Sequence, residues 1–263
     1  MRIVTLLENT RLREDLRAEH GLSLYIETGG RRILFDSGQS DASARNAEIL
    51  GVDLSRVDLM VLSHGHYDHG GGLGEFLRLN QTAPVYVNQR AFQPHYNGTQ
   101  KYIGLDPALQ ACDRIRYTDE LTDLGGGLRL IPGKAVPQPF GAEPYGLNVE
   151  ENGVLRPDDF LHEQYLECTE NGRKILFSGC SHRGIRNITD FFRPDILVGG
   201  FHFKKLDPEG AGAPVLRENA AALLGYPTVY YTCHCTGTAQ YDFLKPLMGE
   251  KLHALHTGSV LEL

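Results

Sequence analysis

The chain has 263 residues, of which 41% are hydrophobic and 22% are charged, and its formal net charge is −7. This composition is ordinary for a globular protein whose core is large enough to fold without disulfide staples. The acidic balance, without a run of basic residues, argues against a nucleic-acid surface, and no stretch approaches the ~18 apolar residues of a membrane span.

The cysteines and the N-terminus favour a cytoplasmic protein. The five cysteines are unevenly spaced and odd in number, unlike a disulfide framework, which points to a reducing compartment. Glu8 interrupts the first apolar run too early for a signal peptide, so this run is expected to be a strand.

The first half of the chain has the pattern of short strands separated by turns. Residues 3–7, 22–27 and 32–35 are predicted strands, and residues 42–50 form a predicted helix that ends at Gly51. The apolar run at 57–62 predicts another strand. A helix beginning in residues 73–79 and a strand at 85–87 follow.

The most informative segment comes directly after the predicted strand at 57–62. His64, His66, Asp68 and His69 fall within six positions, and neutral imidazole and carboxylate are ligands that suit zinc, iron or manganese. His64 and His66 alternate along extended backbone and can point the same way, whereas the other two come round a turn. The spacing therefore predicts two adjacent metal ions rather than a polar loop that holds histidines by chance.

Residues 88–160 lack a regular pattern and contain clusters of proline, glycine and tyrosine. A long irregular stretch inside a compact domain is often a functional loop, and the alternative is a disordered insertion. We predict a single domain over residues 1–263 with an irregular insertion or lid at about 88–160.

The second half of the chain returns to regular elements. Residues 164–168 and 174–178 predict a hairpin, because Asn171-Gly172 between them is a strong turn signal. Helices are predicted at 185–192, 216–224 and 241–248, and Pro246 can kink the last of them. Strands are predicted at 195–199, 228–232, 253–256 and 260–263. This alternation predicts two packed β-sheets with helices outside.

Further ligand-type residues lie beside these later strands. Histidines at strand ends favour a metal site over core packing for His182 and His234, whereas the two interpretations are balanced for His20 and His202. His162 precedes the strand at 164–168 and is also a candidate ligand.

Three cysteines need a separate interpretation. Cys233 and Cys235 are too few for a closed structural zinc site, so they fit better as small buried residues that line a site. Cys180 beside two cations would be a thiolate and a candidate metal ligand.

These motifs resemble the metallo-β-lactamase fold superfamily over nearly the whole chain. The resemblance is carried by His64-Gly-His66-Tyr-Asp68-His69, with Asp36 at an earlier strand end and His234 at a late one. Residues 18–23, 179–182, 199–202 and 233–237 also look like the dihydropterin–ribofuranosylaminobenzene phosphate synthase subgroup, whose activity belongs to folate-like cofactor synthesis.

The resemblance implies an α+β fold, a four-layer αββα sandwich with the metals at one edge of the two sheets. His64 and His66 would bind the first metal, and Asp68, His69 and His234 the second. Asp36 would orient the cluster from behind, as imidazoles bound to metals usually require. Zn²⁺ is expected, as one or two ions, with iron or manganese as alternatives.

Two departures from the superfamily pattern leave alternatives open. The third histidine of the first metal is either His162, which has about the usual placement, or His182. Cys180 stands where the superfamily has an aspartate that bridges the metals, so the bridge is absent or is a thiolate. The native metal and the occupancy of the second site therefore stay open.

We expect a metal-dependent hydrolase, or a related lyase or transferase, that uses a metal-bound hydroxide. The expected substrate is a small phosphate-bearing molecule, and a pterin-like compound is one candidate. Asp68, His20 and His202 are the predicted catalytic residues, with either histidine as general acid or substrate ligand. The expected partner is a small anionic molecule, not a nucleic acid or a membrane. The alternatives are a metal-dependent oxidoreductase and a non-enzymatic metal or ligand sensor.

Overall fold

A computed structural model describes residues 1–263 and contains two seven-stranded sheets. The strand order of the first sheet is β18-β1-β2-β3-β4-β5-β8. Its strands are β1 (Arg2–Leu7), β2 (Ser23–Thr28), β3 (Arg31–Phe35), β4 (Leu59–Val61), β5 (Val85–Asn88), β8 (Ile115–Thr118) and β18 (Val260–Glu262). The strands from β3 to β8 run parallel, so their carboxyl ends meet at one edge.

The second sheet has the order β17-β16-β15-β14-β13-β10-β9. Its strands are β9 (Thr122–Gly125), β10 (Leu128–Pro132), β13 (Gln164–Glu170), β14 (Arg173–Gly179), β15 (Ile196–Gly199), β16 (Val229–Thr232) and β17 (Leu252–Ala254). The predicted hairpin is confirmed as β13 and β14, and its turn holds Asn171 at φ 53° and Gly172 at φ 76°. The strands from β14 to β17 are parallel.

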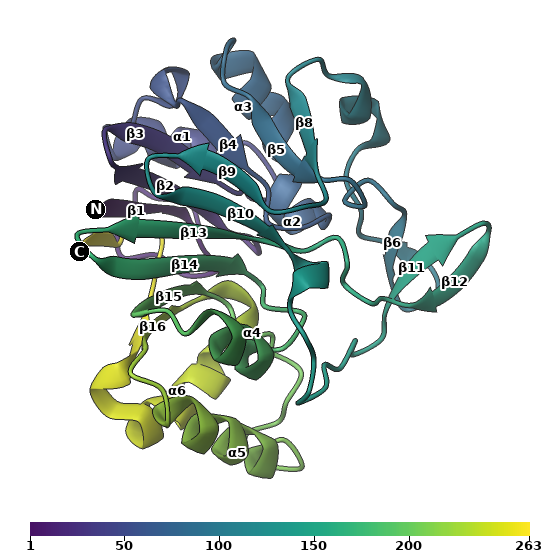
Figure 1. Ribbon diagram of the computed structural model, residues 1–263, viewed down its shortest axis with the longest axis vertical. Helices are drawn as coiled ribbons and strands as arrows, with labels where there is room; N and C mark the ends of the chain where they lie inside the picture. The colour runs from purple at the N-terminus through teal and green to yellow at the C-terminus, as the bar shows by residue number, and fades with distance from the viewer.

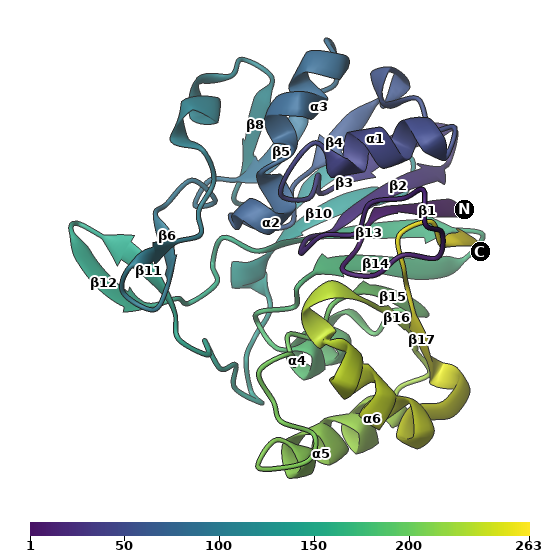
Figure 2. The ribbon, with the colours of Figure 1, turned by 180° about the vertical axis from the view of Figure 1, so that it is seen from behind.

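Helices cover the outer faces of both sheets and complete an αββα sandwich, which confirms the expected fold (Figures 1 and 2). α1 (Ala42–Ile49) and α3 (Leu73–Leu79) lie on the first sheet. α4 (Ile185–Phe192), α5 (Ala213–Leu224) and α6 (Thr238–Met248) lie on the second. None of the helices has the length and apolar composition needed to cross a membrane.

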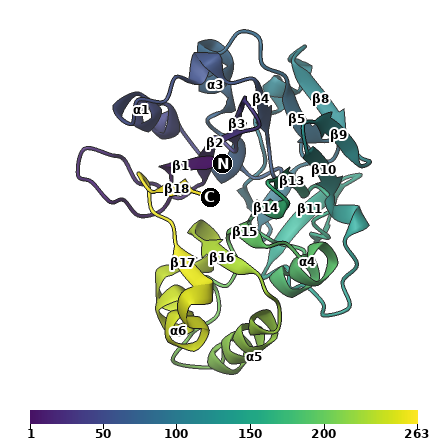
Figure 3. The same cartoon turned by 60° about the vertical axis from the view of Figure 1, so that its left-hand side comes forward.

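The core follows these layers. Apolar side chains from the two sheets meet in the middle, where the rings of Phe35 and Phe177 have centroids 5.7 Å apart. There are two further apolar clusters, one between each sheet and the helices that cover it. Burial of each such side chain contributes about 1.5–3 kcal/mol, so the sandwich fixes the positions of its strand ends firmly. Both termini lie at the same side of the sandwich (Figure 3), where the Met1 ammonium donates to the Leu263 carbonyl at 3.1 Å.

Residues 88–160 are more regular than the sequence pattern predicts. They supply β8 to the first sheet and β9 and β10 to the second. They also form all of a separate four-stranded sheet of order β12-β11-β6-β7, which projects beyond one side of the sandwich (Figure 1). Its strands are β6 (His95–Asn97), β7 (Lys101–Tyr102), β11 (Leu147–Glu151) and β12 (Val154–Pro157). All four strands are short, and β7 and β12 are mostly exposed, so they leave little alternation in the sequence.

The parallel strands deliver polar residues to a common edge. Asp36 directly follows β3, and Cys180 directly follows β14. His64 comes just after β4, and His234 just after β16. A short helix, α2 (Tyr67–Gly70), carries Asp68 and His69 back to the same edge.

Candidate metal centre

The structure brings the eight predicted metal ligands into one buried region at this edge. Three of them form the first ligand group, defined as His64, His66 and His182, whose ligand-type atoms lie within 4.8 Å of one another. His64 Nε2 and His182 Nε2 are 3.3 Å apart. Two nitrogens at the usual zinc distance in tetrahedral geometry would be about 3.3–3.4 Å apart, so this pair fits a shared cation.

The second ligand group consists of His20, Asp68 and His234. Asp68 Oδ2 lies 3.2 Å from His20 Nε2 and 3.2 Å from His234 Nε2. His20 was a candidate for proton transfer, and its place beside Asp68 also makes it a candidate ligand. The side chain of His20 is 40% exposed, so it can serve either purpose.

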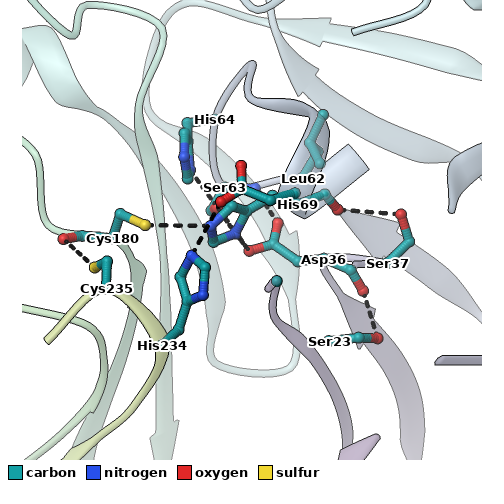
Figure 4. Close-up of polar contacts among 12 residues, drawn as sticks. Ser23, Asp36, Ser37, Leu62, Ser63, His64, His69, Cys180, His234 and Cys235 are labelled. Carbon is teal, nitrogen blue, oxygen red and sulfur yellow. Dashed lines mark hydrogen bonds and ion pairs between the residues drawn. The ribbon is translucent and has the colours of Figure 1, made fainter. Parts of the chain in front are cut away.

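Cys180 and His69 lie near His64, and their ligand-type atoms are within 4.8 Å of its own. Cys180 Sγ is 3.2 Å from His69 Nε2, and Asp36 Oδ2 is 2.6 Å from the other ring nitrogen (Figure 4). This contact brings the thiol to the edge where the histidines converge. Its sulfur can face the same cation as His69.

Hydrogen bonds behind the cluster decide which imidazole nitrogens are free. Asp36 accepts from the Ser63 hydroxyl at 2.7 Å and from His69 Nδ1. Because the Ser63 hydroxyl has given its proton to Asp36, it accepts from His64 Nδ1 at 2.8 Å. His234 Nδ1 similarly donates to Asn9 Oδ1 at 2.9 Å. The Nε2 lone pairs of His64 and His234 are therefore available to a cation, and that of His69 becomes available once its Nε2 proton is displaced.

Several residues of the centre hold strained backbone. Asp36, Ser181, His202 and His234 all have φ between 50° and 59°, a region that non-glycine residues rarely adopt. Each such residue costs of order 1–3 kcal/mol and persists only where packing holds it, as at functional sites. Gly179 has φ 61°, and a Cβ there would lie 2.4 Å from Ser63 Oγ. Only glycine therefore lets β14 approach the strand end that carries His64.

The electrostatics suit cation binding. Burial holds the pKa of His64, His66, His182 and His234 below the usual range, so these rings stay neutral. Burial alone would raise the pKa of Asp68, but the His20 and His234 imidazoles beside its carboxylate keep that pKa well below the usual range.

His69 and Cys180 carry protons that a cation would displace. Burial disfavours the charged imidazole, yet the Asp36 carboxylate raises the pKa of His69 to about 9. Burial and the neighbouring Cys235 raise the pKa of the Cys180 thiol. A thiolate there would need a cation beside it.

A pocket of about 490 Å³ opens over the centre. Its wall includes His20, His66, His182 and His202, and its rim carries the ammonium groups of three lysines. These are Lys101 of β7 and the adjacent pair Lys204 and Lys205, which follow β15. The lysine ion pairs in the structure involve Lys134, Lys174 and Lys245 instead. The rim lysines therefore have no carboxylate partner, although Lys205 Nζ donates to the Tyr145 carbonyl and Lys101 Nζ lies 5.8 Å from the centre of the Tyr67 ring.

The two uncertain histidines occupy different places. His202 packs against His182 with ring centroids 4.2 Å apart, and neither of its ring nitrogens has a hydrogen-bond partner. His162 accepts from the Gly65 backbone N–H through Nδ1 at 2.9 Å. His182 thus has the better geometry for the third ligand of the first metal.

Of the tyrosines at 88–147, Tyr145 lies near His202, with ring centroids 5.6 Å apart.

Sequence reasoning missed three buried groups near the centre. His95 and Asp158 lie next to His66 and His162, and all four have ligand-type atoms within 4.8 Å of one another. Glu163 accepts from the backbone N–H of His182 at 2.6 Å and so holds the loop that carries this histidine. The only local signal was the i, i+4 spacing of Asp158 and His162, which is too common to assign a role.

Comparisons with known proteins agree with this geometry. The family model for the metallo-beta-lactamase superfamily matches residues 16–205. The 7,8-dihydropterin-6-methyl-4-(beta-D-ribofuranosyl)-aminobenzene-5'-phosphate synthase of Methanocaldococcus jannaschii is 26% identical, over 93% of this chain and 90% of its own. The structure of Tm1679, described as a metal-dependent hydrolase of the beta-lactamase superfamily, superposes with a TM-score of 0.84 at 30% identity. That match covers 100% of this chain and 99% of the other.

Proposed function

The chain belongs to the metallo-beta-lactamase superfamily, and from this premise we propose that it is a metal-dependent enzyme acting on a small phosphate-bearing molecule. The observation that supports the proposal most strongly is the pocket itself. Its floor holds two ligand groups of neutral imidazole and carboxylate, and its rim holds three lysines without ion pairs. The synthase of M. jannaschii, which is named for a 5'-phosphate compound, supports the same substrate class.

We assign His64, His66 and His182 to one cation. Asp68 and His234 of the second ligand group are assigned to a second, together with His69, whose ring centroid lies 4.9 Å from that of His234. Cys180 lies beside His64 and His69. A bound divalent cation would polarise a substrate oxygen and lower the pKa of a water molecule. Zinc suits the imidazole, carboxylate and thiol donors best, and iron or manganese would suit fewer of them.

The remaining residues of the pocket bind substrate and move protons. The rim lysines would hold the phosphate group, because ammonium groups pair with its oxygens. His20 and His202 border the pocket and can each deliver a proton to a leaving group. Leu147 and Ile103 form an apolar wall that excludes water from part of the pocket. Tyr145 beside His202 could stack on a flat ring such as a pterin.

Metal analysis of purified protein tests the ligand assignment. After expression in supplemented medium, the wild type should retain a transition metal, whereas H66A and H182A should lose metal equivalents. H162A should keep the wild-type stoichiometry at saturating metal, since His162 is not assigned as a ligand. Absence of metal from the wild type would contradict the central claim. Loss of metal from H162A but not from H182A would reverse the choice of third ligand.

A substrate panel tests the reaction. Metal-loaded wild type should turn over at least one member of a set of phosphomonoesters and phosphodiesters, and H66A should not. Turnover of lactones or thioesters alone would exclude the proposed substrate class. Tight phosphate binding without any turnover would favour a ligand sensor instead.

A further inference from the structure

A buried cluster behind His66 is not used by the proposed reaction. It consists of His95, Asp158 and His162 together with His66, and the exposed fraction of each residue is 5% or less. Nε2 of His66, His95 and His162 is in each case buried without a hydrogen-bond partner. Unpaired polar atoms are costly in a protein interior, so their convergence requires an explanation.

The protons of this cluster can be assigned one by one. The Gly65 backbone N–H donates to His162 Nδ1 at 2.9 Å, so the proton of the neutral His162 ring must sit on Nε2. That N–H faces Asp158 Oδ2 at 3.3 Å. His162 thus directs its proton toward Asp158, although this contact lacks hydrogen-bond geometry.

The position of the proton on His95 follows from its contact with the same carboxylate, that of Asp158. Its Nδ1 is 2.8 Å from Asp158 Oδ2, and a carboxylate only accepts, so this nitrogen carries the proton. The Nε2 of His95 is then a lone pair. Its ring lies near the ring of His66, with centroids 5.4 Å apart at an interplanar angle of 81°.

His66 belongs to both the first ligand group and this cluster. The two nitrogens of an imidazole point in different directions. One nitrogen of His66 can therefore bind the cation of the first ligand group while the other faces the buried cluster. A histidine that binds a cation through Nδ1 must carry its proton on Nε2, which here is buried and needs an acceptor. His95 belongs to the same group, whose ligand-type atoms lie within 4.8 Å of one another, and its unpaired Nε2 can supply that acceptor.

We propose that His95 and Asp158, supported by His162, form a buried relay that fixes His66 as an Nδ1 metal ligand by accepting its Nε2–H. All three are positioning residues, because they act on the metal only through His66. The relay rests on the proposed function, since it requires a cation in the first ligand group.

The same four residues also have the composition of a cation site, but the hydrogen bonds argue against it. A cation bound to His162 Nε2 would require that nitrogen to lose its proton while Gly65 N–H still points at Nδ1. Asp158 Oδ2 also already faces two imidazoles. The relay leaves no such conflict.

The relay also links two parts of the fold. His95 begins β6 and Asp158 directly follows β12, so both belong to the four-stranded sheet that also carries Lys101. The proposed acceptor for His66 and one lysine of the pocket are thus held by the same small sheet. Correct docking of this sheet would then be required for both metal affinity and substrate binding.

Co²⁺ titration of the metal-free protein tests the relay, because the visible spectrum reports the ligand set and chelator competition reports affinity. H95F should bind Co²⁺ on the order of 10–100-fold more weakly than wild type, with an altered spectrum. H95Q, whose amide can accept one proton and donate another, should recover most of the affinity. H253F, which changes a histidine outside the centre, should match the wild type.

D158N provides a second variant of nearly identical shape. Its amide N–H₂ would donate to His95 Nδ1, which moves the His95 proton to Nε2 and places two donors face to face at His66. D158N should therefore lose Co²⁺ affinity as strongly as H95F, while circular dichroism of the apo form stays native.

The outcomes separate the two proposals. If wild type binds no Co²⁺, the proposed function and the relay both fail. If wild type binds Co²⁺ and both H95F and D158N match it in affinity and spectrum, the relay alone fails. The relay also fails if H95F loses one extra equivalent of metal with no change at the first ligand group, because the cluster would then be a cation site.

Discussion

At the scale of single residues, the centre depends on carboxylates that bind no metal. Asp36 is fully buried and accepts from the Ser63 backbone N–H and hydroxyl as well as from His69 Nδ1. Its charge therefore sets the proton positions of two ligands, directly on His69 and through Ser63 on His64. Asp158 has the corresponding position behind His66 in the relay proposed above.

Replacement of Asp36 tests this dependence. D36N puts an N–H donor where one of three donors now points, so either His69 or Ser63 loses its acceptor. Zinc affinity should fall about 10–100-fold, and the free energy of unfolding should fall by about 1–3 kcal/mol because a buried donor is left unpaired. Chelator competition and urea denaturation measure the two effects. D242N, at an exposed position of α6, should change neither.

If D36N retained wild-type zinc affinity, the orienting role of Asp36 would be wrong. A loss of stability without a loss of affinity would give Asp36 a purely structural role.

At the scale of elements, the β13–β14 hairpin shows how local sequence fixes part of the site. Asn171 and Gly172 both have positive φ, which matches the right-handed twist of the two strands. The turn sets the pairing of β13 with β14, and β14 ends at Gly179, directly before Cys180. A turn at the far end of the hairpin thus determines where the thiol lies.

The turn can be tested with a matched pair of glycine substitutions. A Cβ added at Gly172 or at Gly74 meets no atom within 4 Å, so neither change causes a clash. G172A should destabilise the protein by about 1–2 kcal/mol, since alanine is strained at φ 76°. G74A, inside α3, should instead stabilise it by up to about 1 kcal/mol. Equal effects in urea denaturation would show that backbone strain does not govern this turn.

The elements that the sequence predicted well are those with one buried face. The helix at 185–192 matches α4 at both ends, because its apolar residues recur at helical spacing. The predicted strand at 57–62 is shorter in the structure, where β4 covers Leu59–Val61. The four-stranded sheet was not foreseen, because both residues of β7 are exposed and β12 is nearly so. Its pairing depends on tertiary contacts that no local pattern records.

The same distinction holds for the site. The histidines after β4 and β16 were identifiable, because ligand types at the carboxyl ends of parallel strands converge. The relay was not identifiable, since His95 and Asp158 are 63 positions apart in the chain and meet only through the docking of the small sheet. The lysines at the rim were missed for the same reason.

At the scale of the whole molecule, the pocket lies where all three sheets contribute residues. The two large sheets supply the metal ligands, and the small sheet supplies Lys101. The chain carries a net charge of −7, yet the mouth of this pocket concentrates three positive charges. A local positive field at this mouth attracts small anions such as the proposed phosphate-bearing substrate.

Phosphate binding by the zinc-loaded protein tests this arrangement. K101A, K204A and K205A should each raise the Kd for inorganic phosphate about 2–5-fold, because exposed ion pairs contribute about 0.2–1 kcal/mol each. The triple variant should lose on the order of 10–100-fold, since the three charges act on one ligand from separate positions. Isothermal titration calorimetry provides the constants, and K134A, whose ammonium already pairs with Asp119 and Glu120, is the matched control.

Salt dependence separates binding at the rim from binding at the metal alone. Wild-type affinity for phosphate should fall as ionic strength rises, because exposed charges are screened within about 10 Å at 0.1 M salt. The triple variant should show a weaker dependence, since its remaining contacts are with buried groups at the pocket floor. If the triple variant kept both the wild-type Kd and the wild-type salt slope, the lysines would have no part in anion binding. Selectivity for a phosphate-bearing substrate would then have to come from the metal centre and the apolar wall.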